Sequence, residues 1–246
     1  GSFSLLVMSP TKLIAVRDPF GVRPLCMGRI GEDYVFASET CALDTVGAEF
    51  VRDVKPGEII TLHHGQFSSD ERFCTEKTAS CIFEHIYFAR PDSIIDGQSV
   101  NESRVLTGQL LAQQHPVDAD LVIGVPDSGL SSAIGYSMES GIPFGLGLVK
   151  NRYIGRTFIQ PSQSQRERSV ALKLNVLKSN VNGKRIIMVD DSIVRGTTIA
   201  NIVKLLKKAG ALEVHVRIAS PKFLFPCFFG TDVPDSDQLA CCKYTD

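Results

Sequence analysis

Short apolar runs separated by turn-forming residues follow one another along the first 75 residues of the chain. The runs at 5–8, 13–16, 34–39 and 58–62 have the length and the flanking proline, glycine or polar residues of β-strands. The segment that follows is polar, and its groups His63-His64-Gly65 and Ser68-Ser69-Asp70 predict turns. We expect too few strands for a complete sandwich of two sheets, so we interpret this region as part of a larger β-rich domain.

The pattern changes near residue 100, where apolar residues begin to recur at helical spacing. A helix is predicted over 100–114, and apolar runs at 119–125, 142–149, 185–189 and 213–219 predict strands. Two of these strands end abruptly at small polar residues that precede another helical pattern. Strands that alternate with helices predict an α/β domain with a mainly parallel, doubly wound sheet.

The stretch 185–198 carries the clearest candidate chemistry. Its apolar run ends at Asp190 and Asp191, which therefore lie at the carboxyl end of a strand. A loop rich in small and hydroxylated residues follows, and then a helix over 199–209. The N–H groups at such a helix N-terminus, together with the hydroxyls of the loop, can hold a phosphate group.

Two adjacent carboxylates would repel a bare phosphate, so they need another partner. The vicinal hydroxyls of a sugar, or a magnesium ion carried by a diphosphate, meet this need. The loop lacks the G-x-x-x-x-G-K-[ST] pattern, which excludes the usual nucleoside-triphosphate P-loop. The alternative is that Asp190 and Asp191 only end a strand and cap the next helix.

Composition and charge narrow the class of protein. The chain has 246 residues, of which 43% are hydrophobic and 22% charged, as in ordinary soluble globular proteins. A net charge of -1 argues against a general nucleic-acid binder, no apolar run is long enough to span a bilayer, and the first residues lack the basic start of a secretory signal. We therefore expect a cytoplasmic protein with neither nucleic-acid nor membrane partners.

Two local features add to this picture. Residues 150–185 hold nine basic residues and one acid, Glu167, which predicts a site for a polyanion. Seven cysteines at irregular spacing do not form a disulfide framework, so in a reducing compartment they are core thiols or metal ligands.

The stretch around the acid pair resembles the phosphoribosyl-pyrophosphate (PRPP) binding motif of the type I phosphoribosyltransferases. The resemblance implies that Asp190 and Asp191 contact the ribose hydroxyls and, together with Ser128, a magnesium ion. It also implies that the loop at 125–129 binds pyrophosphate and that the basic loop at 150–161 closes over PRPP and excludes water. The substrate-binding residues expected on this basis are Asp127, Ser128, Gly129, Lys150, Arg152, Arg156, Asp190, Asp191, Ser192, Arg195, Gly196, Thr197 and Thr198.

Other passages resemble the amidophosphoribosyltransferase family, in which a glutaminase domain of the N-terminal-nucleophile class precedes the phosphoribosyltransferase domain. The passages that match are Arg17-Asp18-Pro19, Gly21 to Leu25, Ala37 to Thr40 and Pro56 to Glu58 in the glutaminase domain, and Cys81 to Ser93 at the start of the transferase domain. The resemblance implies a partial glutaminase domain over 1–75. It implies a phosphoribosyltransferase domain, incomplete at its C-terminus, over 76–246.

The glutaminase nucleophile of this family is a cysteine at the mature N-terminus, whose free α-amine serves as base. Here the first residue is Gly1 and the nearest cysteine is Cys26. We therefore interpret the chain as a piece truncated at both ends, which has no certain catalytic residue and is inactive with glutamine.

In one branch of the family, four cysteines ligate a [4Fe-4S] cluster. The resemblance assigns Cys81 and Cys227 as two of these ligands, and we expect the other two beyond the end of the chain. The adjacent Cys241 and Cys242 do not replace them. For each assigned cysteine alone, a buried thiol is the alternative.

The family reaction converts PRPP, glutamine and water into 5-phosphoribosylamine, pyrophosphate and glutamate, the first committed step of purine synthesis. The resemblance implies magnesium as a cofactor, feedback inhibition by purine nucleotides, and a homo-oligomer. Two alternatives remain: a salvage-type phosphoribosyltransferase that uses a purine base, and a regulator that binds PRPP without consuming it. The passages at Arg17 to Leu25 and Cys81 to Ser93 disfavour both.

Overall fold

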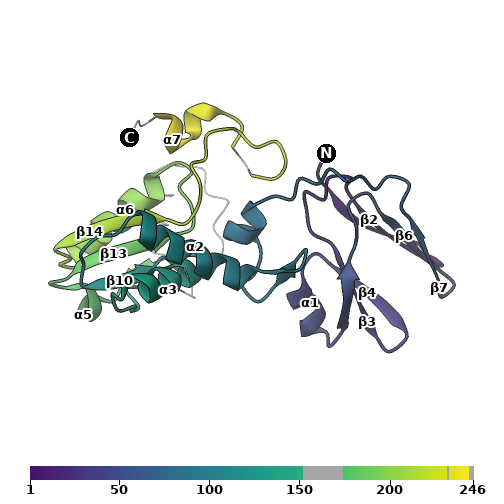
Figure 1. Cartoon of the computed structure of the whole chain (residues 1–246), viewed down its shortest axis with the longest axis horizontal. Coiled ribbons are helices and arrows are strands. Elements are labelled where there is room, and N and C mark those ends of the chain that lie inside the picture. Colours follow the sequence, from purple (N-terminus) through teal and green to yellow (C-terminus); the bar gives the residue numbers. More distant parts are fainter. Residues whose placement is uncertain (152–173, 232, 244–246) are drawn as a thin grey trace. The chain divides into compact units, whose positions relative to one another are not determined.

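The computed structural model describes residues 1–151, 174–231 and 233–243, and the chain divides into two compact units, 1–103 and 104–246 (Figure 1). Arg152 and Arg156, which the resemblance assigns to the substrate, lie outside the described residues. No helix in the described ranges is long and apolar enough to cross a membrane.

The first unit contains two antiparallel sheets that share a core. One sheet has the order β1-β2-β6-β7 and the other the order β4-β3-β5. The strands are β1 (Ser4–Met8), β2 (Lys12–Arg17), β3 (Cys26–Ile30), β4 (Asp33–Ala37), β5 (Glu49–Asp53), β6 (Ile59–His63) and β7 (Gln66–Asp70). Ala15 and Ile60 of the first sheet pack with Leu25, Met27 and Val54 from the region of the second. The expectation of too few strands for two packed sheets is therefore wrong.

Strand β7 also corrects the turn predicted at residues 68–70. Its polar residues form an edge strand that pairs with β6 along its whole length. Only His64 and Gly65, which have positive φ angles, form the turn between the two strands. An edge strand with one neighbour leaves its side chains largely in water, so its sequence carries little apolar pattern.

The rest of the first unit begins with a helix that packs beside the smaller sheet. Helix α1 (Thr40–Thr45) contributes Leu43 to a buried cluster with Cys26 and Ala48. After a long connection come a π-helical turn η1 (Glu84–Phe88) and the short hairpin β8 (Ile94–Ile95) and β9 (Gln98–Ser99).

The second unit is built on a parallel sheet of order β10-β13-β14. These strands are β10 (Leu121–Gly124), β13 (Arg185–Asp190) and β14 (Glu213–Ile218). The other elements are α2 (Val100–Gln114), which begins in the first unit, α3 (Gly129–Ser140), β11 (Leu148–Lys150), β12 (Leu174–Val176), α5 (Lys178–Val181), α6 (Thr197–Lys208), the 3-10 turn η2 (Ser236–Gln238) and α7 (Ala240–Lys243). The predicted helix over 100–114 and the predicted parallel α/β arrangement are confirmed.

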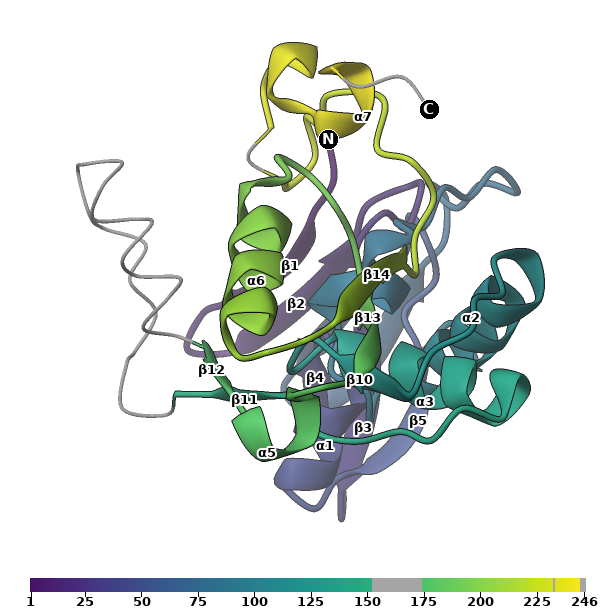
Figure 2. The ribbon, with the colours of Figure 1, turned by 90° about the vertical axis from the view of Figure 1, so that its left-hand side faces the viewer.

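Strand β13 is buried on both faces of this sheet. Ile186 and Met188 pack with residues of α6 on one face, whereas Ile187 and Val189 pack with Ala133 of α3 on the other. Figure 2 shows α6 on one side of the three strands and α2 with α3 on the opposite side. Burial of both faces explains the uninterrupted apolar run, and the layered arrangement confirms the doubly wound fold.

The strand predicted over 142–149 is shorter than expected. Phe144 makes one parallel bridge to Val122, and only β11 forms a regular pair, with β12. Between these points the backbone packs closely on β10, because a Cβ on Gly147 would lie 2.7 Å from side-chain atoms of Ile123. Close contact through glycine therefore replaces regular pairing in this segment.

Helices α2 and α3 cross at two glycines. A Cβ on Gly108 would lie 1.9 Å from the carbonyl oxygen of Ser132, and a Cβ on Gly135 would lie 2.0 Å from that of Val105. The two backbones are thus in direct contact. This crossing fixes α3, whose N-terminal end follows the polar loop after β10.

We expect Gly135→Ala to lower the free energy of unfolding by about 2 kcal/mol, because the added methyl group forces the two helices apart and outweighs the better helix propensity of alanine. Urea unfolding followed by circular dichroism measures this change. Gln114→Ala, at an exposed position of α2, is the control and should change stability by less than about 0.5 kcal/mol. Equal stability of the Gly135 variant and the wild type would contradict the close crossing.

Candidate functional site

Asp190 and Asp191 lie at the carboxyl end of β13, as predicted. Their exposed fractions are only 8% and 7%. Burial, and then the charge of Asp191, raise the pKa of Asp190 to about 7, although the N–H of Asp191 donates a hydrogen bond to Asp190 Oδ1 at 2.9 Å. None of the basic side chains in the described residues forms an ion pair with either acid. Within the part of the chain that the structure describes, the two acids therefore form a buried site with no protein cation paired to it.

The loop after β10 meets this acid pair. The Ser128 hydroxyl donates a hydrogen bond to one carboxylate oxygen of Asp191, and the Ser192 hydroxyl donates one to the other. A Cβ on Gly129 would lie 2.8 Å from the carbonyl oxygen of Val189, so the loop and the end of β13 touch through their backbones. The fold thus brings together the three residues that the resemblance assigns to magnesium.

These three groups supply some, but not all, of the ligands that a magnesium ion needs. Two carboxylates and a hydroxyl are the hard oxygen ligands that this ion prefers. No group of three or more His, Cys, Asp or Glu side chains among the described residues is arranged to hold a metal ion alone. The residues fit a magnesium ion that takes its remaining ligands from substrate phosphates and water, as this ion usually does.

The start of α6 offers N–H groups to an anion. Gly196, with φ of +78°, precedes the first helical residue, Thr197. Within residues 1–151, 174–231 and 233–243, no group accepts a hydrogen bond from the N–H of Gly196, Thr197 or Thr198. The side chains of the two threonines are exposed beside these N–H groups. Such a helix N-terminus favours a phosphate through both its free donors and its dipole.

Two of the predicted substrate-binding cations have protein partners. Lys150 Nζ, at the end of β11, lies 2.7 Å from Asp127 Oδ2 in the loop after β10. Arg195 donates a hydrogen bond to Gln238 Oε1 at 2.6 Å. Sequence reasoning selected Lys150, Asp127 and Arg195, but it did not predict either pairing.

Comparison with known proteins shows which family the chain belongs to. The phosphoribosyl transferase domain family matches residues 95–220, about half of the chain, and the glutamine amidotransferase domain family matches residues 1–45. The chain belongs to the phosphoribosyl transferase domain family. Both matches agree with the order of domains that the sequence motifs imply.

Relatives that match over the whole chain are named amidophosphoribosyltransferase. The protein of Archaeoglobus fulgidus is 52% identical over 245 residues, which cover 100% of this chain and 54% of the relative. The protein of Mycobacterium tuberculosis (strain H37Rv) is 54% identical over 239 residues, which cover 97% of this chain and 45% of the relative. The chain therefore spans about half the length of the curated relatives it matches.

Solved structures give the same result. The glutamine PRPP amidotransferase from B. subtilis, complexed with ADP and GMP, matches with a TM-score of 0.90 at 50% identity and covers 100% of this chain and 54% of its own. A structure described as the allosteric regulatory enzyme of purine biosynthesis matches equally well, with a TM-score of 0.90. The resemblance to the amidophosphoribosyltransferases and the predicted fold class are confirmed.

The two cysteines assigned to an iron-sulfur cluster lie in different units. Burial raises the pKa of the Cys227 thiol, but contacts with the Thr231 hydroxyl and with the N–H groups of Thr231, Phe229 and Gly230 leave the pKa below its ordinary value. The N–H of Phe229 donates to the sulfur at 3.4 Å. These donors stabilise a thiolate, the form that ligates iron. Cys81 is a partly exposed free thiol, and its pairing with Cys227 stays a prediction.

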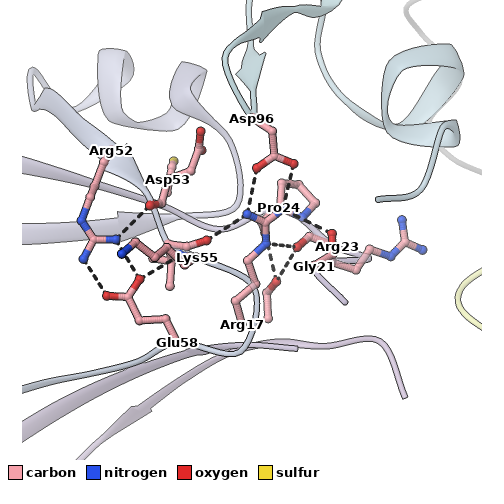
Figure 3. A network of polar contacts seen from close by, with 12 residues as sticks. Arg17, Gly21, Arg23, Pro24, Arg52, Asp53, Lys55, Glu58 and Asp96 are labelled. Carbon is pink, nitrogen blue, oxygen red and sulfur yellow. Dashed lines mark hydrogen bonds and ion pairs between the residues drawn. The ribbon is translucent and has the colours of Figure 1, made fainter. Parts of the chain in front are cut away.

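A buried arginine organises the polar network of the first unit (Figure 3). Arg17 is 1% exposed and donates to both carboxylate oxygens of Asp96 at 2.9 and 3.0 Å. It also donates to the carbonyl oxygens of Val54, Gly21 and Arg23. The matched passage that begins at Arg17 therefore has a structural role in this unit, because its buried arginine joins Asp96 to three backbone carbonyl groups.

A second matched passage, Pro56 to Glu58, also has a structural role in this unit. Glu58 is fully buried and accepts hydrogen bonds from both terminal nitrogens of Arg52 at 2.6 and 2.7 Å, from the Lys55 N–H and from the Ser69 hydroxyl. Burial raises the pKa of Glu58, but these hydrogen bonds leave it below its ordinary value. Figure 3 shows Arg52 and Lys55 around this carboxylate.

The remaining matched passages contact each other. Glu39 Oε2 accepts hydrogen bonds from the Arg90 N–H at 2.8 Å and from the Ser93 hydroxyl at 2.7 Å, and the Thr40 hydroxyl accepts one from the Ile94 N–H. The segment that the resemblance assigns to the start of the transferase domain therefore packs within the first unit. The domain boundary at residue 75 stays a prediction.

Proposed function

We propose that this chain forms the PRPP-binding site of an amidophosphoribosyltransferase. The observation that carries the proposal is the buried pair Asp190 and Asp191, which forms no ion pair with any basic side chain of the described residues, contacts the loop after β10 through Ser128 and is followed by the free N–H groups of α6. A ligand that offers sugar hydroxyls, a phosphate and a metal-bound diphosphate satisfies all three parts together. PRPP is such a ligand.

Each part of the site has a role in this proposal. The carboxylates of Asp190 and Asp191 accept hydrogen bonds from the ribose hydroxyls, and the N–H groups from Gly196 to Thr198 hold the 5-phosphate. The loop from Asp127 to Gly129 holds the diphosphate, with Lys150 beside it. Ser128 and the two acids would hold a magnesium ion, which would supply neutralisation of the charge on the departing diphosphate. The chain itself therefore acts by positioning the sugar and its leaving group.

For the intact protein we propose the family reaction, in which PRPP, glutamine and water give 5-phosphoribosylamine, pyrophosphate and glutamate in purine synthesis. The names of the relatives support this proposal. Purine nucleotides are proposed as inhibitors, since the related B. subtilis structure contains ADP and GMP. A cytoplasmic location and a homo-oligomer are part of the same proposal.

We also propose that Cys81 and Cys227 ligate a [4Fe-4S] cluster in the intact protein. The N–H groups around Cys227 support a thiolate ligand. The domain assignment of 1–75 to the glutaminase and 76–246 to the transferase belongs to the same proposal.

The proposed site is tested by calorimetric titration of PRPP into the protein with and without magnesium. We expect saturable binding that requires magnesium, because the acid pair and the diphosphate otherwise repel each other. Ribose 5-phosphate with magnesium is the control ligand and should bind at least about tenfold more weakly, since it lacks the diphosphate that carries the metal ion. A protein shown by circular dichroism to be folded, yet unable to bind PRPP with magnesium, would overturn the assignment.

A further inference from the structure

The ion pair between Asp127 and Lys150 lies in the loop where the proposed function places a diphosphate. A diphosphate and the Asp127 carboxylate carry charge of the same sign, and Lys150 is the cation that both would bind. We propose that Asp127 is an internal competitor of the diphosphate for Lys150, which weakens the binding of diphosphate ligands and speeds their release. This inference rests on the proposed function and adds a regulating residue to that site.

The loop is built to receive an anion at its backbone. Gly129 donates its N–H to the Val125 carbonyl oxygen, and α3 begins there with 12 residues. Among the residues that the structure describes, no group accepts a hydrogen bond from the N–H of Asp127 or Ser128. Two free donors and the positive end of the α3 dipole therefore favour an anion beside the loop.

The Asp127 side chain works against that preference. Its carboxylate is 71% exposed and its contact with Lys150 Nζ is 2.7 Å long. Asp127 is not one of the proposed magnesium ligands. An exposed carboxylate beside a bound diphosphate therefore only adds repulsion. The Asp127 carboxylate is therefore better explained by its ion pair with Lys150 than by a contact with the substrate.

Lys150 can exchange one partner for the other. Its backbone is held in β11, where it pairs with Leu174, but its side chain is 57% exposed and ends a flexible four-carbon chain. Exposed ion pairs typically change an equilibrium constant by no more than about fivefold. The pair is thus weak enough for a diphosphate to break and strong enough to reduce the affinity for the diphosphate measurably.

The inference is tested by titrating inorganic pyrophosphate with magnesium into the full chain at low ionic strength. The variants are Asp127→Asn, which removes the competing charge, Asp127→Glu, which keeps it, and Lys150→Met with and without Asp127→Asn. The control is Asp118→Asn, which breaks another exposed ion pair of the same unit, Asp118 with Arg185 at 2.6 Å.

We expect Asp127→Asn to bind pyrophosphate about three- to fivefold more tightly, and Asp127→Glu and Asp118→Asn to bind it like the wild type. In the Lys150→Met background, Asp127→Asn should change affinity by less than about twofold, because there is no lysine left to release. The unfolding midpoint of Asp127→Asn should equal that of the wild type, which a purely structural role would not predict.

Unchanged or weaker pyrophosphate binding by Asp127→Asn would overturn the inference, as would an equal gain in the Lys150→Met background. Either result leaves the proposed function standing when the wild type binds PRPP with magnesium. A folded wild type that binds neither PRPP nor pyrophosphate overturns the proposed function and this inference with it.

Discussion

The double substitution Asp190→Asn with Asp191→Asn is expected to weaken magnesium-dependent PRPP binding by more than about 100-fold. Each carboxylate loses charge-assisted hydrogen bonds to the ribose, worth about 1.5–3 kcal/mol each, and the magnesium ion loses two anionic ligands. Calorimetric titration of PRPP with magnesium measures the loss. Normal affinity in the double variant would mean that the acids only end a strand.

The stability of the same variant separates a binding role from a folding role. Both acids are at least nine-tenths buried and pair with no cation among the described residues, so neutral amides relieve repulsion and desolvation in the folded state. We therefore expect an unfolding midpoint at or above that of the wild type. The matched control is Asp118→Asn with Asp120→Asn, which removes two acids that pair with Arg185 at the opposite end of β13. It should leave PRPP affinity within about twofold of the wild type.

The parts of the site that the sequence predicted correctly are local ones. The acid pair follows directly on an apolar strand and precedes a helical pattern, so its place at the end of β13 is fixed by neighbours along the chain. Contact with the loop after β10 follows too, because the carboxyl ends of adjacent parallel strands meet at one edge of a sheet. Family resemblance then suggested PRPP as the ligand to propose, where the residue pattern alone left open a sugar or a metal-bound diphosphate.

The parts that sequence reasoning missed depend on tertiary contacts. Strand β3 was not among the predicted strands. Its residue Gly28 is explained by the neighbouring strand, because a Cβ at this position would lie 2.8 Å from the carbonyl oxygen of Glu49. The pair of Lys150 with Asp127 joins residues 23 positions apart from two different elements. In both cases the residue type is explained only by a partner that no local pattern identifies.

The same reasoning predicts a large effect of Arg17→Met on stability. We expect it to lower the free energy of unfolding of the first unit by about 3 kcal/mol, since the buried contacts to the Val54 and Gly21 carbonyl oxygens and the part-buried one to Arg23 are lost, and Asp96 loses its ion-pair partner. Burial and the nearby Asp96 raise the pKa of Asp53, and Arg17 opposes this effect, so its removal also leaves two acids facing each other. Urea unfolding monitored by hydrogen exchange of β2 and β6 amides measures the loss.

Two further variants show whether the carbonyl contacts or the ion pair carry this effect. Asp96 is 43% exposed, so Asp96→Asn keeps a hydrogen-bond acceptor at a hydrated site and should cost about 1 kcal/mol. Lys55→Met removes an exposed pair with Glu71 and should leave the unfolding midpoint close to that of the wild type. If Asp96→Asn destabilises the unit as much as Arg17→Met, the ion pair dominates and the contacts to Gly21, Arg23 and Val54 contribute little. The buried position of Arg17 and its three carbonyl partners favour the opposite order, in which this side chain stabilises the first unit mainly by holding the turn at residues 21–24 against β2.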